Sequence, residues 1–455
     1  MQPSGPSIID SATPTSSGLA VEGSSTPVLT AASRLKQLWL PLGAAVLVLA
    51  PGLGLRLAGV DIGPLEGTAL YGVAILAAGF LLSWGAETAE EYMPPGLVLA
   101  LVAMITVLPE YAVDFYFAYQ AGQNPAGGYV AYAAANMTGA NRMLVGLAWP
   151  VMVLLNWWRT RDRQIALAPV NAIEVGFLGV ASAYAFVIVL KQSIGLMDTA
   201  VLFAVFGFYL YRVGRAPKPE GKDMQESESP GPPLVLVSMA SPQRWTLIAF
   251  MVVLSIVAIL AVAEPFAESL IASGRALNID EFLLIQWIAP VASEAPAIVI
   301  AVLFVLNSRA GAALIAMISD KINQWPLLVG MLPLAMSLGA GALTAMPLDA
   351  RQQEEFFLTS AQSLFGLALI LRLRLTTLGA VALIVLFVGQ IAVSFGFRGD
   401  LDTEIAILTG IAWGYLVLAA AIAALNWRSL LNAGQAVFAN RTLTIAAETE
   451  IARTP

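Results

Sequence analysis

Two stretches of the sequence, 184 residues apart, decide the fold. Residues 106–150 read TVLPEYAVDFYFAYQAGQNPAGGYVAYAAANMTGANRMLVGLAWP, and residues 290–334 read PVASEAPAIVIAVLFVLNSRAGAALIAMISDKINQWPLLVGMLPL. They align without a gap. Only seven of the 45 positions are identical, but a glutamate meets a glutamate and Asn136 meets Asp320. Two apolar hairpins with polar residues at matching positions indicate an internal repeat.

The composition around these copies places them in a membrane. Of the 455 residues, 58% are hydrophobic and 12% are charged, about half the charged share of a soluble protein. The net charge is −7 and no basic patch appears, which excludes a nucleic-acid binder. Histidine and cysteine are absent, so His-based catalysis, thiolate chemistry and zinc sites are excluded. We expect no enzyme and no cofactor, and oxygen atoms remain as ligands for a hard cation.

Twelve apolar stretches are long enough to cross a bilayer, which takes roughly 20 residues per helix. We place them at 38–60, 66–86, 94–121, 126–157, 168–190, 195–213, 244–265, 279–307, 309–341, 356–374, 376–396 and 404–426. The chain is therefore expected to be an all-α polytopic membrane protein. The stretches 126–157 and 309–341 are long and contain polar residues, so each is expected to be a broken helix.

The basic residues predict the orientation. With twelve crossings, 16 of the 20 Lys and Arg residues outside the spans fall on the side of the N-terminus, and four fall on the other side. Because positive loops stay in the cytoplasm, we expect both termini there, in a multi-pass protein of the cell membrane. An odd number of spans separates the two copies, so they would be inverted relative to each other. Inverted repeats are the usual construction of secondary transporters.

The same layout divides the chain into six regions. We expect a disordered N-terminal tail (1–33), an extra transmembrane helix (34–65), a first inverted repeat of five spans (66–213), a cytoplasmic linker (214–243), a second inverted repeat of five spans (244–396), and an extra transmembrane helix with the C-terminal tail (397–455).

Glu110 and Glu294 lie inside apolar spans, beside prolines. A carboxylate at the bilayer centre is costly, so it persists there when it binds a cation, carries a proton or pairs with a base. Pro109 precedes Glu110. Pro290 and Pro296 flank Glu294. Each proline frees the carbonyl four residues back, and freed carbonyls beside a carboxylate predict a cation site.

Other oxygen-bearing residues of the two segments could complete this site. Asp114 and Thr106 lie four residues after and before Glu110, on the same helix face. The hydroxyl of Ser293 could instead bond back to its own helix. The candidate ligands besides the two glutamates are Thr106, Asp114, Asn136, Asn141, Ser293 and Asp320.

Two bases within the spans, Arg142 and Lys321, would modulate the charge of the site. Lys321 could pair with Asp320 or with a glutamate across the bundle. A fixed ammonium there would replace one transported cation and change the charge carried. Alternatively, Lys321 could extend to the membrane interface.

These segments resemble the α-repeats of the Ca²⁺:cation antiporter superfamily, of the sodium/calcium exchanger type. Its inverted repeats carry a motif near G-T-S-L-P-E and, after a glycine-containing joint, G-N-x-x-G-S-N. TVLPE (106–110) is similar to the first part. ANMTGAN (135–141) is similar to the second, with Ala for the first Gly and for Ser, and its Gly139 allows close helix contact. The second copy retains Glu294 and has an acid, Asp320, at the Asn position.

The resemblance implies an antiporter that works by alternating access. Glu110 and Glu294 would be the central ligands, with Asn136 and Asp320 beside them. The family usually extrudes Ca²⁺ against Na⁺ or H⁺, so the implied partners are inorganic cations and the lipid bilayer.

Three other functions stay open. A Na⁺/H⁺ antiporter on the same fold would cycle a proton on one carboxylate, while Lys321 neutralised another. A cation channel would more often show a short filter loop. A membrane scaffold that no longer transports would leave the buried acids without a purpose.

Overall fold

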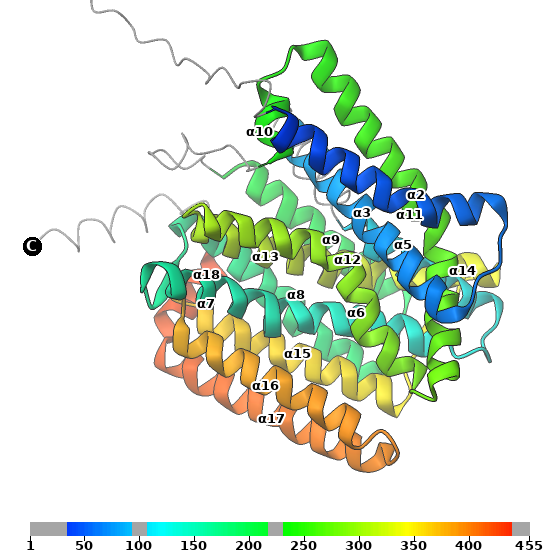
Figure 1. Ribbon diagram of the computed structural model, residues 1–455. Helices are drawn as coiled ribbons and strands as arrows, with labels where there is room; N and C mark the ends of the chain where they lie inside the picture. Colours follow the sequence, from blue (N-terminus) through cyan, green and yellow to red (C-terminus); the bar gives the residue numbers. More distant parts are fainter. Residues whose placement is uncertain (1–33, 93–106, 217–230, 439–455) are drawn as a thin grey trace, which may run out of the picture.

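The computed structural model describes residues 34–92, 107–216 and 231–438, which form a bundle of helices (Figure 1). The predicted tail 1–33, Thr106, part of the linker and the end of the C-terminal tail lie outside the described residues. In the N-terminal half the elements are η1 (Leu35–Trp39), α2 (Leu40–Ala58), α3 (Pro64–Glu90), α5 (Leu108–Gln123), α6 (Tyr129–Met143), η2 (Leu144–Ala148), α7 (Trp149–Thr160), β1 (Gln164–Ala166), η3 (Pro169–Asn171), α8 (Ala172–Lys191), β2 (Ser193–Ile194) and α9 (Leu196–Gly214).

The C-terminal half continues in the same style, with helices joined by short loops. Its elements are α10 (Pro232–Val237), α11 (Ser241–Leu277), α12 (Glu281–Leu306), α13 (Ala310–Ile322), η5 (Asn323–Leu328), α14 (Val329–Ala340), β3 (Met346–Pro347), α15 (Ala350–Ile370), β4 (Arg374–Thr376), α16 (Thr377–Gly396), α17 (Leu401–Leu425) and α18 (Trp427–Phe438).

Within the described ranges, nine helical segments are long and apolar enough to cross a membrane. The prediction of an all-α polytopic membrane protein is confirmed. The other three predicted spans correspond to α5, to the run from α13 to α14, and to α15. These three carry several of the buried charged side chains. The number of twelve crossings and the inverted relation of the two halves stay predictions.

The two long spans expected to be broken are continuous. Residues 144–148 between α6 and α7, and residues 323–328 between α13 and α14, are π-helical. A π-helical turn accommodates an extra residue without ending the helix, and it often occurs at functional sites. The expectation of a break was wrong. The polar residues of these spans are buried against neighbouring helices, so the helix accommodates them without an interruption.

Helix α11 is longer than the predicted span 244–265, because it runs through Pro265 to Leu277. A proline removes one helical hydrogen bond, but packing in a membrane bundle tolerates such an interruption. Helix α11 packs closely along α3 over much of its length. The predicted end at residue 265 was therefore wrong.

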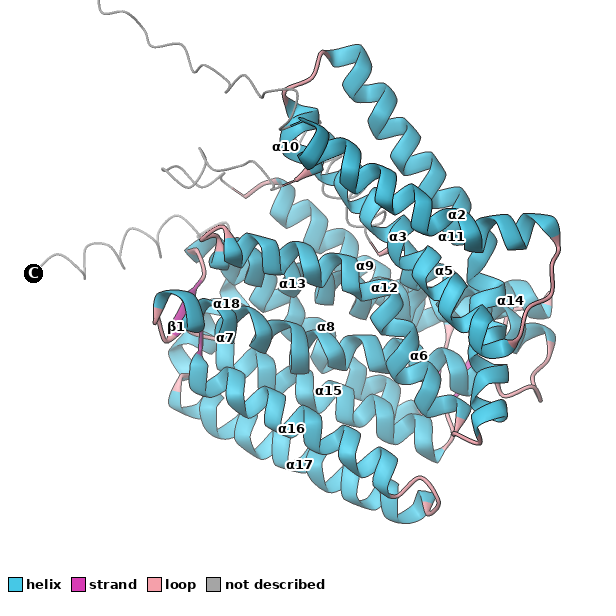
Figure 2. Cartoon of the chain, viewed as in Figure 1, coloured by secondary structure: helices cyan, strands magenta, loops and turns pink. Residues whose placement is uncertain are grey.

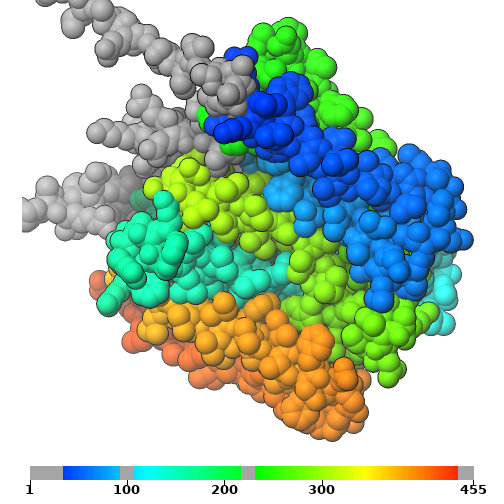
Figure 3. Space-filling model, in the orientation of Figure 1, coloured from blue at the N-terminus to red at the C-terminus, as the bar shows by residue number. Residues whose placement is uncertain are grey.

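The helices pack around two apolar clusters. One joins α2, α3, α5, α11 and α12, and the other joins α7, α8, α13, α15 and α17. Figure 3 shows α2 and α11 at one edge of the molecule and α16 and α17 at the opposite edge. Within the described ranges, strands occur only as short pairs at helix ends (Figure 2), β1 with β4 and β2 with β3, both antiparallel.

Two glycine contacts set the helix crossings near the centre. A Cβ built on Gly139 of α6 would lie 2.0 Å from the carbonyl oxygen of Gln286 on α12. A Cβ on Gly339 of α14 would lie 2.0 Å from the carbonyl oxygen of Tyr119 on α5. Only glycine allows backbones to approach this closely. The close helix contact expected for Gly139 is therefore present. It brings α6 against α12, the helix on which the second stretch begins.

Candidate functional site

Four carboxyl groups from three helices meet inside the bundle. Glu110 and Asp114 on α5 and Glu294 on α12 are buried, and Asp320 on α13 is partly buried. The carboxyl groups of Glu110 on α5 and Glu294 on α12 are close enough to interact electrostatically. Asp114 and Asp320 are both close enough to interact electrostatically with Glu110. The structure therefore brings together acids from both segments that the sequence singled out.

Several oxygens of this cluster have no donor. The amide nitrogen of Asn136 donates to Oδ1 of Asp114 at 2.9 Å. Among the described residues, none donates to either Glu110 oxygen, to Asp114 Oδ2 or to Asn136 Oδ1. Buried acceptors are normally satisfied, so acceptors that gather without donors indicate a place for a cation or a proton. No three acids in the described ranges are arranged to hold a metal ion by themselves, so a bound cation would need amide or carbonyl oxygens as well.

Gln324 is a member of the site that sequence reasoning missed. Its amide nitrogen donates to Glu294 Oε1 at 2.5 Å, and its own oxygen has no donor among the described residues. It belongs to the π-helical segment η5, which shifts the helix register after Asp320. A signal was present, because an amide four residues after an acid lies near the same helix face.

Lys321 lies near Glu110 and holds Asn141. Its ammonium donates to Asn141 Oδ1 at 2.8 Å and to the Asn141 carbonyl at 3.2 Å. It also faces the Trp325 ring at 4.7 Å. Lys321 belongs to no ion pair among the described residues. In this conformation the Asn141 amide oxygen is therefore taken by an ammonium.

Arg142 is neutralised by a residue outside the two segments. Its guanidinium pairs with Glu355 on α15, and both side chains are fully buried. Arg142 also donates to Gln390 Oε1 at 3.3 Å, and Gln286 donates to Glu355 at 2.7 Å. The acid pair of QQEEFF (352–357) was the available signal, but the sequence places it at a span end.

The remaining candidates contribute less. Ser293 Oγ donates to the carbonyls of Ala289 and Pro290 at 3.3 and 3.4 Å, so its hydroxyl is bonded back to its own helix. Its lone pairs stay available to a ligand. Thr106 lies outside the described residues.

Comparison with known proteins finds similarity to cation exchangers. The family model for sodium/calcium exchanger proteins matches residues 67–214. The crystal structure of an H⁺/Ca²⁺ exchanger, CAX, has 36% sequence identity and a TM-score of 0.81, and the match covers 90% of this chain and 98% of that chain. The structure of YfkE, at 11% identity and a TM-score of 0.54, covers 82% of this chain and 100% of that chain and shares the fold. No curated protein matches.

Proposed function

Since this chain belongs to the sodium/calcium exchanger family of the Ca²⁺:cation antiporter superfamily, we propose that it exchanges Ca²⁺ for H⁺ or Na⁺ by alternating access. The membership confirms the family resemblance of the sequence. Proteins of this family are transporters and not enzymes, and a multi-pass membrane protein of this family is a cation antiporter. The ions, the residues that bind them and the orientation in the cell membrane belong to the proposal.

One observation carries the proposal, namely the buried oxygens without donors on Glu110, Asp114 and Asn136. Carboxylate and amide oxygens are the ligands that Ca²⁺ and Na⁺ take in proteins. We assign the cation to these three residues and Glu294, with Asp320 and Ser293 close by. Asn141 would join only if Lys321 released its amide oxygen. Thr106 is added from the sequence alone, as the residue four positions before Glu110.

The electrostatic interaction between the buried carboxyl groups of Glu110 and Glu294 supports H⁺ as the counter-ion. Two buried carboxyl groups that repel each other cannot both stay ionised without a cation, so a proton on one of them replaces the cation when it leaves. A cation between the two groups would displace that proton, because each charge stabilises both carboxylates. Competition of this kind is what antiport requires. The likeness to an H⁺/Ca²⁺ exchanger favours the same choice.

Flux measurements in proteoliposomes test the proposal. A pH gradient and a Na⁺ gradient are imposed in turn, while Ca²⁺ uptake and internal pH are followed. We expect Ca²⁺ uptake to need an outward gradient of H⁺ or Na⁺. Glu110→Gln and Glu294→Gln should each lower the rate by at least about tenfold, which corresponds to about 1.4 kcal/mol.

Glu66→Gln is the matched control, because Glu66 is an exposed acid in the first turn of α3. Its rate should equal that of the wild type. Uptake that continues without any gradient of a counter-ion would point to a channel and contradict antiport. Normal transport by both central variants would overturn the site assignment, whatever the ion.

A Na⁺/H⁺ antiporter is the second candidate, and Lys321 favours it. A fully buried ammonium near Glu110 lowers the net negative charge of the site, which favours a monovalent over a divalent cation. The same liposomes decide the question. Proton movement driven by Na⁺ and unaffected by Ca²⁺ would support this candidate against Ca²⁺ exchange.

A further inference from the structure

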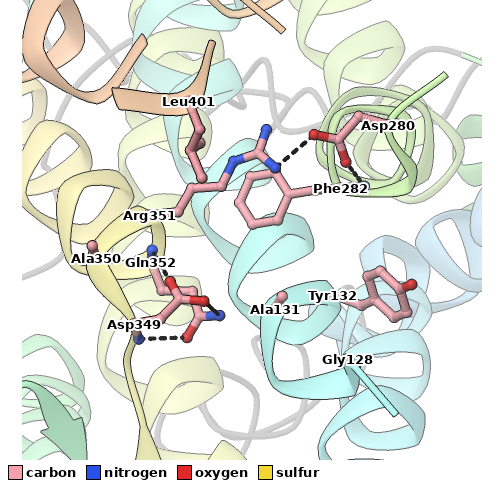
Figure 4. A pocket seen from close by; sticks show the side chains of 10 residues that line it. All are labelled: Gly128, Ala131, Tyr132, Asp280, Phe282, Asp349, Ala350, Arg351, Gln352 and Leu401. Carbon is pink, nitrogen blue, oxygen red and sulfur yellow. Dashed lines mark hydrogen bonds and ion pairs between the residues drawn. The ribbon is translucent and has the colours of Figure 1, made fainter. Parts of the chain in front are cut away.

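A cavity of about 460 Å³ lies away from the four-carboxylate site. The starts of α6, α12, α15 and α17 enclose it, and its lining includes Tyr132, Asp280, Phe282, Arg351 and Gln352 (Figure 4). None of the candidate cation ligands lines it. All four helix starts belong to the membrane face that the sequence places opposite to the N-terminus.

A chain of charged side chains leads inward from this cavity. Figure 4 shows the Arg351 guanidinium directed at Asp280, at 2.6 Å. Another nitrogen of Arg351 lies 3.8 Å from Oε1 of Glu404, on α17. The side chain of Arg351 is 15% exposed and that of Glu404 only 2%. The charged side chains therefore extend from Asp280 at the cavity wall to the buried Glu404.

Glu354 is the next group, and its carboxyl group has no hydrogen-bond partner among the described residues. It is 5% exposed, and neither of its carboxyl oxygens accepts a hydrogen bond from the described residues. The charged groups that face it are Arg351 and Glu355 on α15, Arg142 on α6 and Glu404 on α17. We call these five residues the Glu354 cluster.

The two bases of the cluster already have acids. Arg142 pairs with Glu355, and Arg351 pairs with Asp280 and contacts Glu404. Glu354 is therefore an excess carboxyl group in a buried place without a donor. An ionised carboxylate is strongly disfavoured there unless it binds something positive.

A proton suits this place better than a metal ion. Two guanidinium groups face Glu354 and would repel a cation of fixed charge. A proton needs only one carboxyl oxygen, and binding it removes the charge that the surroundings disfavour.

Arg142 connects the cluster to the cation site. It directly follows Asn141, whose oxygens hold Lys321, and the charges of Arg142 and Lys321 interact. We propose that Glu354 is a second proton-binding site, reached from the cavity at Asp280 and Arg351 and coupled to the cation site through Arg142. The coupling rests on the proposed antiport, whereas the proton-binding site itself does not.

Infrared spectroscopy of the full chain in lipid bilayers tests the site without transport. The spectrum is followed while the pH is raised, in the region where the C=O bond of a protonated carboxyl group absorbs. We expect Glu354→Gln to remove one pH-dependent component that Glu354→Asp retains at a shifted frequency. The control Asp402→Asn, an exposed acid next to the same cavity mouth, should retain the component that Glu354→Gln removes. Added Ca²⁺ should not remove the Glu354 component.

Proteoliposome flux tests the coupling. The transport rate is measured as a function of proton concentration. The Hill coefficient of that dependence should fall by about one in Glu354→Gln and stay unchanged in Asp402→Asn. Infrared spectra of Glu354→Gln identical to the wild type at every pH would overturn the proton-binding site. An unchanged Hill coefficient would overturn its coupling to transport. If the wild type exchanges no cations, the proposed function fails, and the infrared result still decides whether Glu354 binds a proton.

Discussion

The burial of charge is the main feature at the scale of single residues. Arg142 on α6 and Glu355 on α15 have no exposed side-chain surface, and the two residues are 213 positions apart in sequence. Lys321 is equally buried but is held by the neutral oxygens of Asn141. The sequence left open a pairing of Lys321 with Asp320, with a glutamate across the bundle, or with neither. Among the described residues it pairs with neither acid, and adjacent helical residues such as Asp320 and Lys321 point in different directions. Neighbours in sequence therefore do not identify the partner of a buried charge.

The Arg142–Glu355 pair leads to a prediction about stability. Glu355→Ala leaves a buried guanidinium without its acid, which should lower the free energy of unfolding by about 3–5 kcal/mol. The double variant Arg142→Met with Glu355→Met removes both charges and should lose much less. Denaturant unfolding in detergent measures both. Equal losses in the single and the double variant would contradict the role of charge pairing.

Close contacts and π-helical turns position the site at the scale of helices. The carbonyl of Gln286 lies against Gly139, so α6 and α12 cross with almost no side chain between them. The π-helical segment η5 directs Gln324 toward Glu294. The pattern of apolar residues predicts where helices run, but it contains no information on a local change of helical register.

Gly139 supplies the prediction at this scale. Gly139→Val places side-chain atoms where the Gln286 carbonyl lies, so α6 must move away from α12. We expect a loss of at least about 1–3 kcal/mol in stability and a strong loss of cation uptake. Gly207→Val is the control, because a Cβ there meets nothing within 4 Å.

Thermal unfolding and flux, measured side by side, check this expectation. If the two valine variants behaved alike, the close crossing at Gly139 would not be what positions the site.

The placement of loops relates the whole molecule to the membrane. Strand β1 pairs with β4, at Ile165 and Leu375, and both loops belong to the predicted cytoplasmic face. Strand β2 pairs with β3, at Ile194 and Met346, and both belong to the opposite face. The loops at the cavity also share that opposite face. The paired loops therefore share the sides that the sequence predicts for them, and the number of twelve crossings stays a prediction.

The absence of cysteine makes the orientation directly testable. Asp162→Cys and Arg398→Cys place single thiols on exposed loops at the two ends of the bundle. In intact cells, a membrane-impermeant maleimide should label Arg398→Cys at once and Asp162→Cys only after the membrane is opened. The cysteine-free wild type gives the background. Labelling of both thiols in intact cells, or the reverse order, would contradict cytoplasmic termini.

The sequence by itself determined the membrane class, the helical architecture and the family, because apolar length, the distribution of charge and short motifs are local properties of the chain. It also singled out Glu110 and Glu294, since a carboxylate inside an apolar span needs an explanation wherever it lies. Only the tertiary structure decided which groups meet: the acid that neutralises Arg142, the oxygens that hold Lys321, and the amide of Gln324 beside Glu294. It also left Glu354 without a hydrogen-bond partner among the described residues. These contacts join residues far apart in sequence. The partner of a buried charge therefore depends on which distant helix packs against it.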